Sequence, residues 1–418
     1  MGNRLSPMTA KSTEIGTSKS GALRYAASAM QGRRSQMEDA HLAIPDLFHE
    51  EHDHNLDGHA LFAVFDGHGG SSASRFAAKA LPGILLAHAS MEKYKQLAVS
   101  PAQQLGKDAA KANAALSSAK KQLLKQILED TFIEIDRRYL LARNQAMLAK
   151  QQRDASSNGA GKKRNFKDPG TTALVVLVTP DFVVCANAGD CRAMLIQDEP
   201  SLRDDDDSPP PPSPPPRKKS SATVTTTTTL STVTTAPRRS SSMLSRTLAR
   251  RTSSFVELSQ DHRPDGPSEE KRIQKAGGYV FGGRLEDDLA VSRGFGDFRY
   301  KEDHITLHGV CEQSQRTVAD QKVSPLPEIK FLSRQQTPHK FLFLGCDGVF
   351  EQMSNDKVCR TLSERLQTET LEGACHQLLD KSLRKGSKDN MTALVVQLYH
   401  QTAADTDASE RSQDSPYR

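Results

Sequence analysis

The sequence is poor in the features that mark several classes of protein. It has no tryptophan, and only 5% of its 418 residues are aromatic. It lacks a run of about 18 apolar residues, so no membrane-spanning helix is expected. Its first thirty residues hold no apolar segment of the kind that a secretory signal needs. Lysine and arginine total 56 against 51 for aspartate and glutamate, a balance that does not by itself indicate a nucleic-acid partner.

The cysteines are few and have no regular spacing. None form a CxxC pair, and no Cys/His spacing suits zinc. We therefore predict buried free thiols in a reducing cytosol. The positions are Cys185, Cys191, Cys311, Cys346, Cys359 and Cys375.

The low hydrophobic content, 36%, predicts that part of the chain lies outside a folded core. Residues 1–22 are polar and are predicted to be a flexible arm, and residues 401–418 a polar tail. Residues 201–254 hold runs of aspartate, proline and threonine, which cannot bury enough apolar surface to fold. Because strand-like patterns resume after it, this segment is predicted to be a disordered insertion within one domain of residues 23–400.

Both polar segments carry modification signals. The start Met1-Gly2-Asn3-Arg4-Leu5-Ser6 fits the pattern for N-myristoylation at Gly2. One such chain binds membranes weakly and reversibly, so we expect a cytoplasmic protein that lies in part on the cytoplasmic face of a membrane. The insertion contains the patterns RRSS (238–241) and RRTS (250–253). They suit a basophilic protein kinase, and a solvated linker is the alternative.

Apolar patterns place the regular elements. Strands are predicted at 61–67, 339–348 and 390–399, and a hairpin over 173–196 with its turn at 179–181. Helices are predicted from Ser71 to about His88, near 120–143 and at 267–277. The apolar stripe of the second helix is expected to face the core.

Acidic residues recur next to the strands. Asp66, Asp190 and Asp347 each follow an apolar run, Asp389 precedes one, and Glu38 and Asp39 precede a short one. Carboxylates that converge at one sheet edge repel one another, so such a cluster implies bound cations. Hard oxygen ligands favour Mg²⁺ or Mn²⁺ over zinc. The alternative is that each aspartate merely starts a turn.

Two basic side chains lie near these acids in the sequence. His68, in the glycine-rich DGHGG, is a candidate general acid for a leaving oxygen. Arg34, four residues before Glu38, suits the bidentate binding of a phosphate dianion. The alternatives are a structural histidine in a turn and a solvated surface arginine.

The motifs, in their residues and in their order along the chain, resemble those of a known family, the metal-dependent protein serine/threonine phosphatases of type 2C. The resemblance runs from about residue 23 to 400, interrupted by the insertion. The matching blocks are GRRSQMEDAH (32–41), LFAVFDGHGG (61–70), GTTALVVLV (170–178), ANAGDCRAML (186–195), LSQDHRPDGPSEEKRIQKAGGYV (258–280), LAVSRGFGD (289–297), LGCDGVFEQMS (344–354) and SKDNMTALVV (387–396).

The resemblance implies a four-layer α-β-β-α sandwich of two antiparallel sheets flanked by helices, and two metal ions at one end. It implies that Asp66 bridges both metals, with the Gly67 carbonyl as a further ligand. It assigns Glu38 to one metal, and Asp347 and Asp389 to the other.

The same resemblance implies the chemistry. Arg34 binds the substrate phosphate and His68 protonates the leaving serine or threonine oxygen. A metal-activated water attacks phosphorus and no phosphoenzyme forms. Asp297 matches a family motif but is not a metal ligand there, so we expect it to be structural.

One departure bears on activity. A loosely bound third cation is implied at Asp190 and at position 351, where this sequence has glutamate in place of the family's aspartate. The complete set of main ligands favours an active enzyme that acts on phosphorylated proteins. A non-catalytic phosphoprotein-binding pseudophosphatase is the alternative. Nucleic-acid binding is disfavoured because the basic patches lack interleaved aromatics, and a monomer is expected.

Overall fold

The structure is a computed structural model. It describes residues 7–48, 56–99, 107–156, 168–196, 255–301, 305–306, 309–310, 317–334 and 341–398. The Gly2 motif, the insertion, the tail 401–418 and Cys311 lie outside these residues, so the predictions about them stay predictions. The other five cysteines are free and buried, as expected. Within the described ranges, no helix has the length and apolar content needed to cross a membrane.

Two antiparallel sheets form the centre of the molecule. The first has six strands, in the order β1 (Met8–Thr17), β2 (Leu23–Gly32), β18 (Met391–Leu398), β17 (Phe341–Gly345), β9 (Arg192–Ile196) and β10 (Phe255–Glu257). The second has five, in the order β16 (Glu328–Ser333), β8 (Phe182–Ala188), β7 (Ala173–Val178), β4 (Ala60–Phe65) and β3 (Ala40–Ile44).

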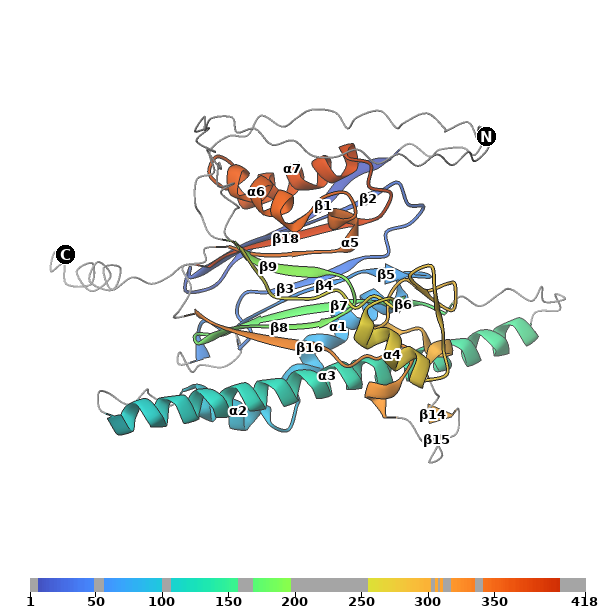
Figure 1. The fold of residues 1–418 in the computed structure, drawn as a ribbon, viewed down its shortest axis with the longest axis horizontal. Helices are drawn as coiled ribbons and strands as arrows, with labels where there is room; N and C mark the ends of the chain where they lie inside the picture. The colour runs from blue at the N-terminus through green and yellow to red at the C-terminus, as the bar shows by residue number, and fades with distance from the viewer. Residues whose placement is uncertain are drawn as a thin grey trace, which may run out of the picture. The chain divides into compact units, whose positions relative to one another are not determined.

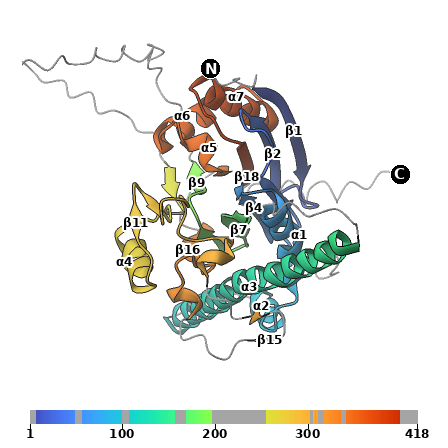
Figure 2. The same cartoon turned by 90° about the vertical axis from the view of Figure 1, so that its right-hand side faces the viewer.

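The sheets pack face to face, and helices cover their outer faces (Figures 1 and 2). One apolar cluster joins the two sheets and includes Phe62 and Val176 from one and Leu344 and Val396 from the other. The outer face of the six-stranded sheet packs against α5 (Asp347–Phe350), α6 (Asn355–Arg365) and α7 (Leu371–Arg384). The four-layer sandwich predicted from the sequence is therefore confirmed.

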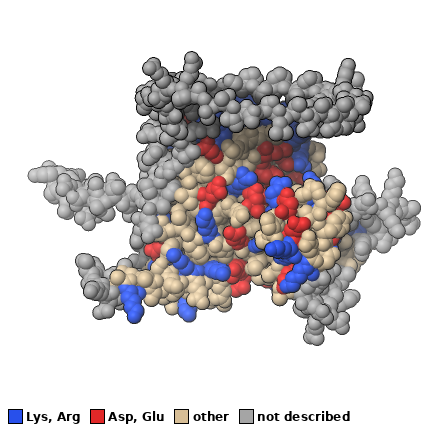
Figure 3. All heavy atoms as spheres, viewed as in Figure 1, with Lys and Arg blue, Asp and Glu red and all other residues tan. Residues whose placement is uncertain are grey.

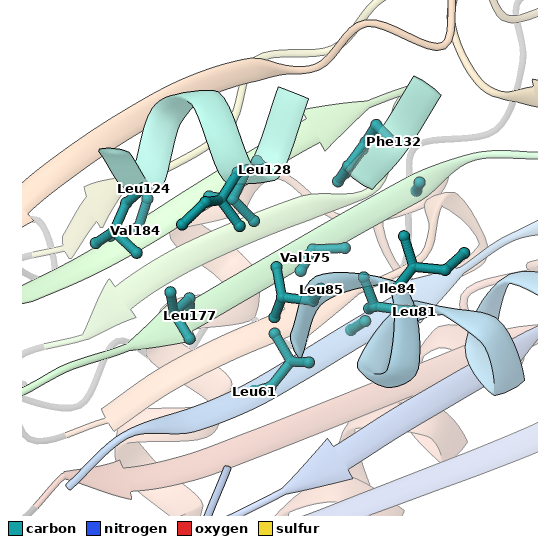
Figure 4. Close-up of a cluster of buried hydrophobic side chains, with 14 of the residues drawn as sticks. Leu61, Leu81, Ile84, Leu85, Leu124, Leu128, Phe132, Val175, Leu177 and Val184 are labelled. Carbon is teal, nitrogen blue, oxygen red and sulfur yellow. The ribbon is translucent and has the colours of Figure 1, made fainter. Parts of the chain in front are cut away.

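The outer face of the five-stranded sheet packs against α1 (Ser72–Leu86), α2 (Met91–Ala98) and the 50-residue helix α3 (Lys107–Ser156). The predicted apolar stripe of α3 faces this core, and Leu124, Leu128 and Phe132 have no exposed surface. Figure 4 shows these side chains against Val175, Leu177 and Val184 of β7 and β8. The helix is longer at both ends than predicted, because its outer turns lack the apolar spacing that identified its middle.

The prediction that residues 1–22 are a flexible arm is wrong over 8–17. These residues form β1, which pairs with β2 from Met8–Gly32 to Thr17–Arg24. The strand is mostly exposed, and Ile15 is 65% exposed. Backbone pairing and polar contacts hold it, among them a 2.6 Å hydrogen bond from the Tyr25 hydroxyl to the Glu14 carboxylate. A polar edge strand has no apolar pattern for sequence reasoning to detect.

The hairpin predicted over 173–196 is correct only in its first part. β7 and β8 pair across the predicted turn, where the Thr179 amide donates to the Phe182 carbonyl. The second run then breaks at Gly189, whose φ is 130°, a conformation open to glycine. The chain crosses there to the other sheet as β9, which pairs with β17 and β10.

Short elements surround one end of the sandwich. β5 (Gly67–His68), β6 (Gly170–Thr171) and β13 (Phe295–Gly296) form a small three-stranded sheet. The predicted helix at 267–277 is confirmed as α4 (Pro267–Lys275), and it precedes the hairpin of β11 (Val280–Phe281) and β12 (Arg284–Leu285). A second small hairpin joins β14 (Ile305–Thr306) and β15 (Gly309–Val310).

The insertion leaves and rejoins the sheet at neighbouring positions. Ile196 at the end of β9 pairs with Phe255 at the start of β10. β9 runs away from Asp190, so both anchor points lie a strand's length from that residue.

We predict that replacing residues 197–254 by Asn-Gly leaves the fold intact. A two-residue turn suits two directly paired antiparallel strands, and the excised segment is not part of the described core. Thermal unfolding should stay cooperative, with a melting temperature within a few degrees of the intact chain. Loss of cooperative unfolding in the shortened protein would show that the insertion contributes to the core.

Candidate active site

The acidic residues singled out in the sequence meet at one end of the sandwich. β4, β8 and β17 end immediately before Asp66, Gly189-Asp190 and Cys346-Asp347, and β18 begins just after Asp389-Asn390. Since neighbouring strands are antiparallel, the ends of some and the starts of others lie at the same edge. The alternative that each aspartate merely starts a turn does not hold at Asp347, which begins α5, or at Asp66, which lies between β4 and β5.

A cavity of about 1000 Å³ opens at this end. Its walls contain most of the predicted site residues, namely Arg34, Asp66, Gly67, His68, Asp190, Asp347, Glu351 and Asp389. Arginines from other elements also line it, namely Arg143, Arg263, Arg284 and Arg299. On the face drawn in Figure 3, acidic and basic side chains are interspersed, in keeping with the small net charge.

Burial and mutual repulsion shift the titration of the acids. Burial, followed by the charges of Asp347, Asp39, Asp190 and Asp389, raises the pKa of Asp66 well above its usual value. Burial, together with neighbouring carboxylates, raises the pKa of Asp190 to about 7. Burial and the charge of Asp389 also raise the pKa of Asp347. In the absence of positive charge these carboxyls cannot all ionise together.

Two of the converging acids each have a buried carboxylate oxygen without a hydrogen-bond partner. These oxygens are Asp347 Oδ1 and Asp39 Oδ1. Ligand atoms of Asp39, Asp66 and Cys346 also lie within 4.8 Å of one another. A buried, unpaired carboxylate oxygen costs free energy unless a cation or donor meets it. The residues present therefore fit divalent cations with oxygen ligands.

Asp39 is a residue that the sequence reasoning left without a role. Its side chain is 7% exposed and accepts a hydrogen bond of 2.7 Å from the Thr392 hydroxyl. Burial raises its pKa to about 7. Glu38, which was assigned as a ligand, is its neighbour in MEDAH, and neither of the two acids is among the residues that line the cavity. The assignment of Glu38 stays a prediction.

Glycines let backbone approach the centre closely. A β-carbon at Gly67 would overlap the Glu38 carbonyl oxygen, and one at Gly348 would overlap the Asn390 carbonyl oxygen. The first glycine lets the Glu38 backbone pack directly against the residue that follows Asp66. The second lets α5, which begins at Asp347, start directly against the strand that follows Asp389.

Arg34 lies at the cavity with its guanidinium paired to the Asp389 carboxylate. Its side chain is 54% exposed, so the group is also accessible from solvent. Glu351 accepts from the Lys388 amide at 3.3 Å, and Asp190 lies 3.8 Å from Arg263. Glu351 and Asp190, the two acids suggested as ligands of a third cation, therefore line the same cavity.

His68 contacts an aspartate that we had expected to be purely structural. Its Nε2 lies 2.8 Å from both carboxylate oxygens of Asp297. Burial lowers the pKa of His68, but the charge and hydrogen bond of Asp297 outweigh it, and the net pKa is raised. The GFGD motif carried Asp297, but nothing in the sequence indicated that its partner is 229 residues away.

Comparison with known proteins agrees with this geometry. The sequence profile of the Protein phosphatase 2C family matches residues 23–203 and 245–391. The chain belongs to this family, and it is a protein serine/threonine phosphatase of the metal-dependent kind.

Individual relatives cover nearly the whole chain. Human Protein phosphatase 1A is 28% identical over 376 residues, covering 90% of this chain and 70% of the relative. "Probable protein phosphatase 2C 5" of Paramecium tetraurelia is 29% identical and covers 95% and 99%. The crystal structure of serine-threonine phosphatase 2C from Toxoplasma gondii has the same fold, with a TM-score of 0.59 at 17% identity, covering 93% of this chain and 99% of that one.

The raised pKa values predict how the metal-free protein responds to pH. Asp39 and Asp190 hold their protons up to about pH 7 when folded, but lose them near pH 4 when unfolded. The folded state binds more protons between these values, so its stability falls as pH rises from about 4 to 7. Urea unfolding in EDTA at pH 5, 6, 7 and 8 should show this fall, on the order of a few kcal/mol per group.

The variant Asp39→Asn tests whether the raised pKa of this carboxyl causes the loss of stability. The amide does not titrate, so this variant should show a smaller loss of stability over the same pH range. Stability that is equal at pH 5 and pH 8 in the native sequence would contradict the repulsion described above.

Proposed function

We propose that the chain hydrolyses phosphoserine and phosphothreonine in proteins with Mg²⁺ or Mn²⁺ at this centre, and without a phosphoenzyme. The observation that carries the proposal is the set of acids that converge on one cavity beside a histidine and an arginine, with an unpaired buried oxygen on Asp347. Asp66, the Gly67 carbonyl, Asp347 and Asp389 would hold two cations, with Glu38 acting through water. Asp190 and Glu351 are the candidates for a third.

The ligand chemistry supports a hard cation. Carboxylate and carbonyl oxygens suit Mg²⁺ and Mn²⁺. When bound, such cations lower the pKa of water and so supply the nucleophile at neutral pH. They also neutralise the repulsion that otherwise keeps some of these carboxyls protonated.

The chain's own residues bind the substrate and move the proton. The Arg34 guanidinium suits two phosphate oxygens at once. As the phosphorus–oxygen bond breaks, its electron pair stays on the serine or threonine oxygen, which takes a proton from the His68 ring. The products are the free hydroxyl side chain and inorganic phosphate.

Direct attack by water is supported by the state of the thiol that follows Asp190 in the sequence. Cys191 follows Asp190 but is fully buried, and its Sγ lies 3.2 Å from the Thr172 hydroxyl. Burial and then the charge of Asp66 raise its pKa well above the ordinary value. A thiol in this state is a poor nucleophile, which argues against a cysteinyl-phosphate intermediate.

We predict that hydrolysis of a phosphothreonine peptide requires Mn²⁺ or Mg²⁺ and stops in EDTA. Asp66→Ala or Asp347→Ala should lose several orders of magnitude in kcat, because each leaves the cations without a ligand. Asp380→Asn, which removes a carboxylate paired with Lys11 far from the cavity, is the control and should retain native activity. Full turnover in EDTA would exclude the proposed reaction.

The same assay distinguishes the enzyme from the alternative, a pseudophosphatase that binds phosphoproteins without hydrolysing them. It predicts that the native protein binds the phosphopeptide and releases no phosphate with either metal. The complete set of Asp66, Asp347 and Asp389 in one cavity favours the enzyme.

We also propose that Gly2 is myristoylated and gives weak, reversible attachment to a membrane. Gly2→Ala should move the protein from the membrane fraction to the soluble fraction, since one acyl chain supplies most of the affinity. Asn3→Ala, at a position the motif leaves open, is the matched control and should not change the distribution. An unchanged distribution in Gly2→Ala would exclude this attachment.

Phosphorylation of the insertion by a basophilic kinase is the remaining proposal, and it rests on the two arginine-serine patterns alone. A solvated linker without a regulatory role is the alternative.

A further inference from the structure

The His68 ring is held on one side by Asp297. The carboxylate is 1% exposed, while the histidine side chain is 32% exposed. Both carboxylate oxygens lie 2.8 Å from Nε2, so this nitrogen faces the protein interior. The hydrogen bonds found among the described residues include none to Nδ1, the ring's other nitrogen.

The backbone at Asp297 is strained in a way that needs support. Its φ and ψ are 52° and 41°, the left-handed region that few non-glycine residues adopt. Such a conformation costs free energy and persists where surrounding contacts enforce it. Strain of this kind is concentrated at functional sites, so a role for the side chain is expected.

Helix α3 supplies much of that support. The Gly296 amide donates to Asp136 Oδ1 at 2.8 Å, and Lys301 Nζ lies 2.9 Å from both Asp136 oxygens. Lys301 also donates to the Gly294 carbonyl. The loop that carries Asp297 is therefore clamped on both sides of this residue by one buried carboxylate.

Strand β6 passes close behind the contact. A β-carbon at Gly170 would overlap both the Asp297 carboxylate and His68 Nε2. Only glycine leaves room for the two side chains to meet there. Three separate elements, α3, β6 and the loop 293–301, thus set one side-chain contact.

We infer that Asp297 is a positioning residue that binds His68 Nε2–H and leaves Nδ1 as the atom that protonates the leaving oxygen. The inference rests on the proposed role of His68. In the step, the breaking phosphorus–oxygen bond leaves its electron pair on the substrate oxygen, and the proton on Nδ1 moves to it. The ring is left neutral with its remaining proton on Nε2, shared with Asp297, as in other carboxylate-oriented histidines.

The test is a double-mutant cycle of His68→Ala and Asp297→Asn, with each variant assayed on a phosphothreonine peptide and on p-nitrophenyl phosphate. The second substrate has a leaving group that hardly needs a proton. Asp297→Asn should lower kcat on the peptide at least about 10-fold and change kcat on p-nitrophenyl phosphate by less than about 3-fold. In the protein that already carries His68→Ala, adding Asp297→Asn should not lower kcat on the peptide any further.

Two further variants perturb the contact from outside the pair. Asp136→Asn loosens the loop that carries Asp297 and leaves the ring itself intact, so it should lower the melting temperature and show, more weakly, the same substrate selectivity as Asp297→Asn. Gly170→Ala forces the ring and carboxylate apart while keeping both, so it should reproduce the substrate selectivity of Asp297→Asn.

Nitrogen-15 NMR of the metal-free protein gives a readout that does not depend on activity. The His68 signals, assigned by their absence in His68→Ala, should show a hydrogen-bonded Nε2 proton in the native protein and lose it in Asp297→Asn.

The outcomes are distinguishable. If His68→Ala slows both substrates equally, the proposed acid role fails and this inference fails with it. In a second outcome, His68→Ala slows the peptide reaction selectively while Asp297→Asn lowers kcat by the same factor with His68 present and with His68→Ala. That result overturns only the positioning role of Asp297.

Discussion

Repulsion between carboxylates is the constraint on which this end of the molecule depends. Asp39, Asp66, Asp190 and Asp347 are brought together by strand ends from both sheets, and burial with mutual charge raises the pKa of each. A fold that needed only stability would not place these groups together without cations. The apolar cores on the two sides of each sheet supply the rigidity that keeps the acids close.

The surrounding backbone is arranged around this cluster. Gly67 and Gly348 allow main chain to approach it where a β-carbon would overlap a carbonyl oxygen. On the far side of the cavity, Asp136 of α3 holds the strained loop of Asp297, which in turn contacts His68. The long helix therefore has a second role besides covering the sheet, because one of its turns connects the core to the candidate proton donor.

Much of this could be predicted from the sequence, and the failures have physical causes. Apolar runs located β4, β17 and β18 and the buried stripe of α3, because their side chains contribute to a core. β1 was missed since a polar edge strand is held by backbone pairing. The second half of the 173–196 segment was misassigned, because periodicity cannot show that a chain changes sheet at Gly189.

In the site, too, some residues could be predicted from the sequence and others could not. Motifs located the residues that line the cavity, including Asp66, Asp347 and Asp389. They gave no role to Asp39, because the burial of its side chain depends on tertiary packing. The contact of Asp297 with His68 depends on the loop that α3 holds, and no local pattern records it.

The central claim is that this cluster is built for cations that replace protons. Calorimetric titration of the metal-free chain with Mn²⁺, repeated in two buffers of different ionisation enthalpy, measures the cations bound and the protons released together. The account predicts at least two Mn²⁺ per chain, with more protons released at pH 6 than at pH 8, and a loss of cations in Asp66→Ala. Binding of no Mn²⁺, or binding with no proton release at pH 6, would contradict it.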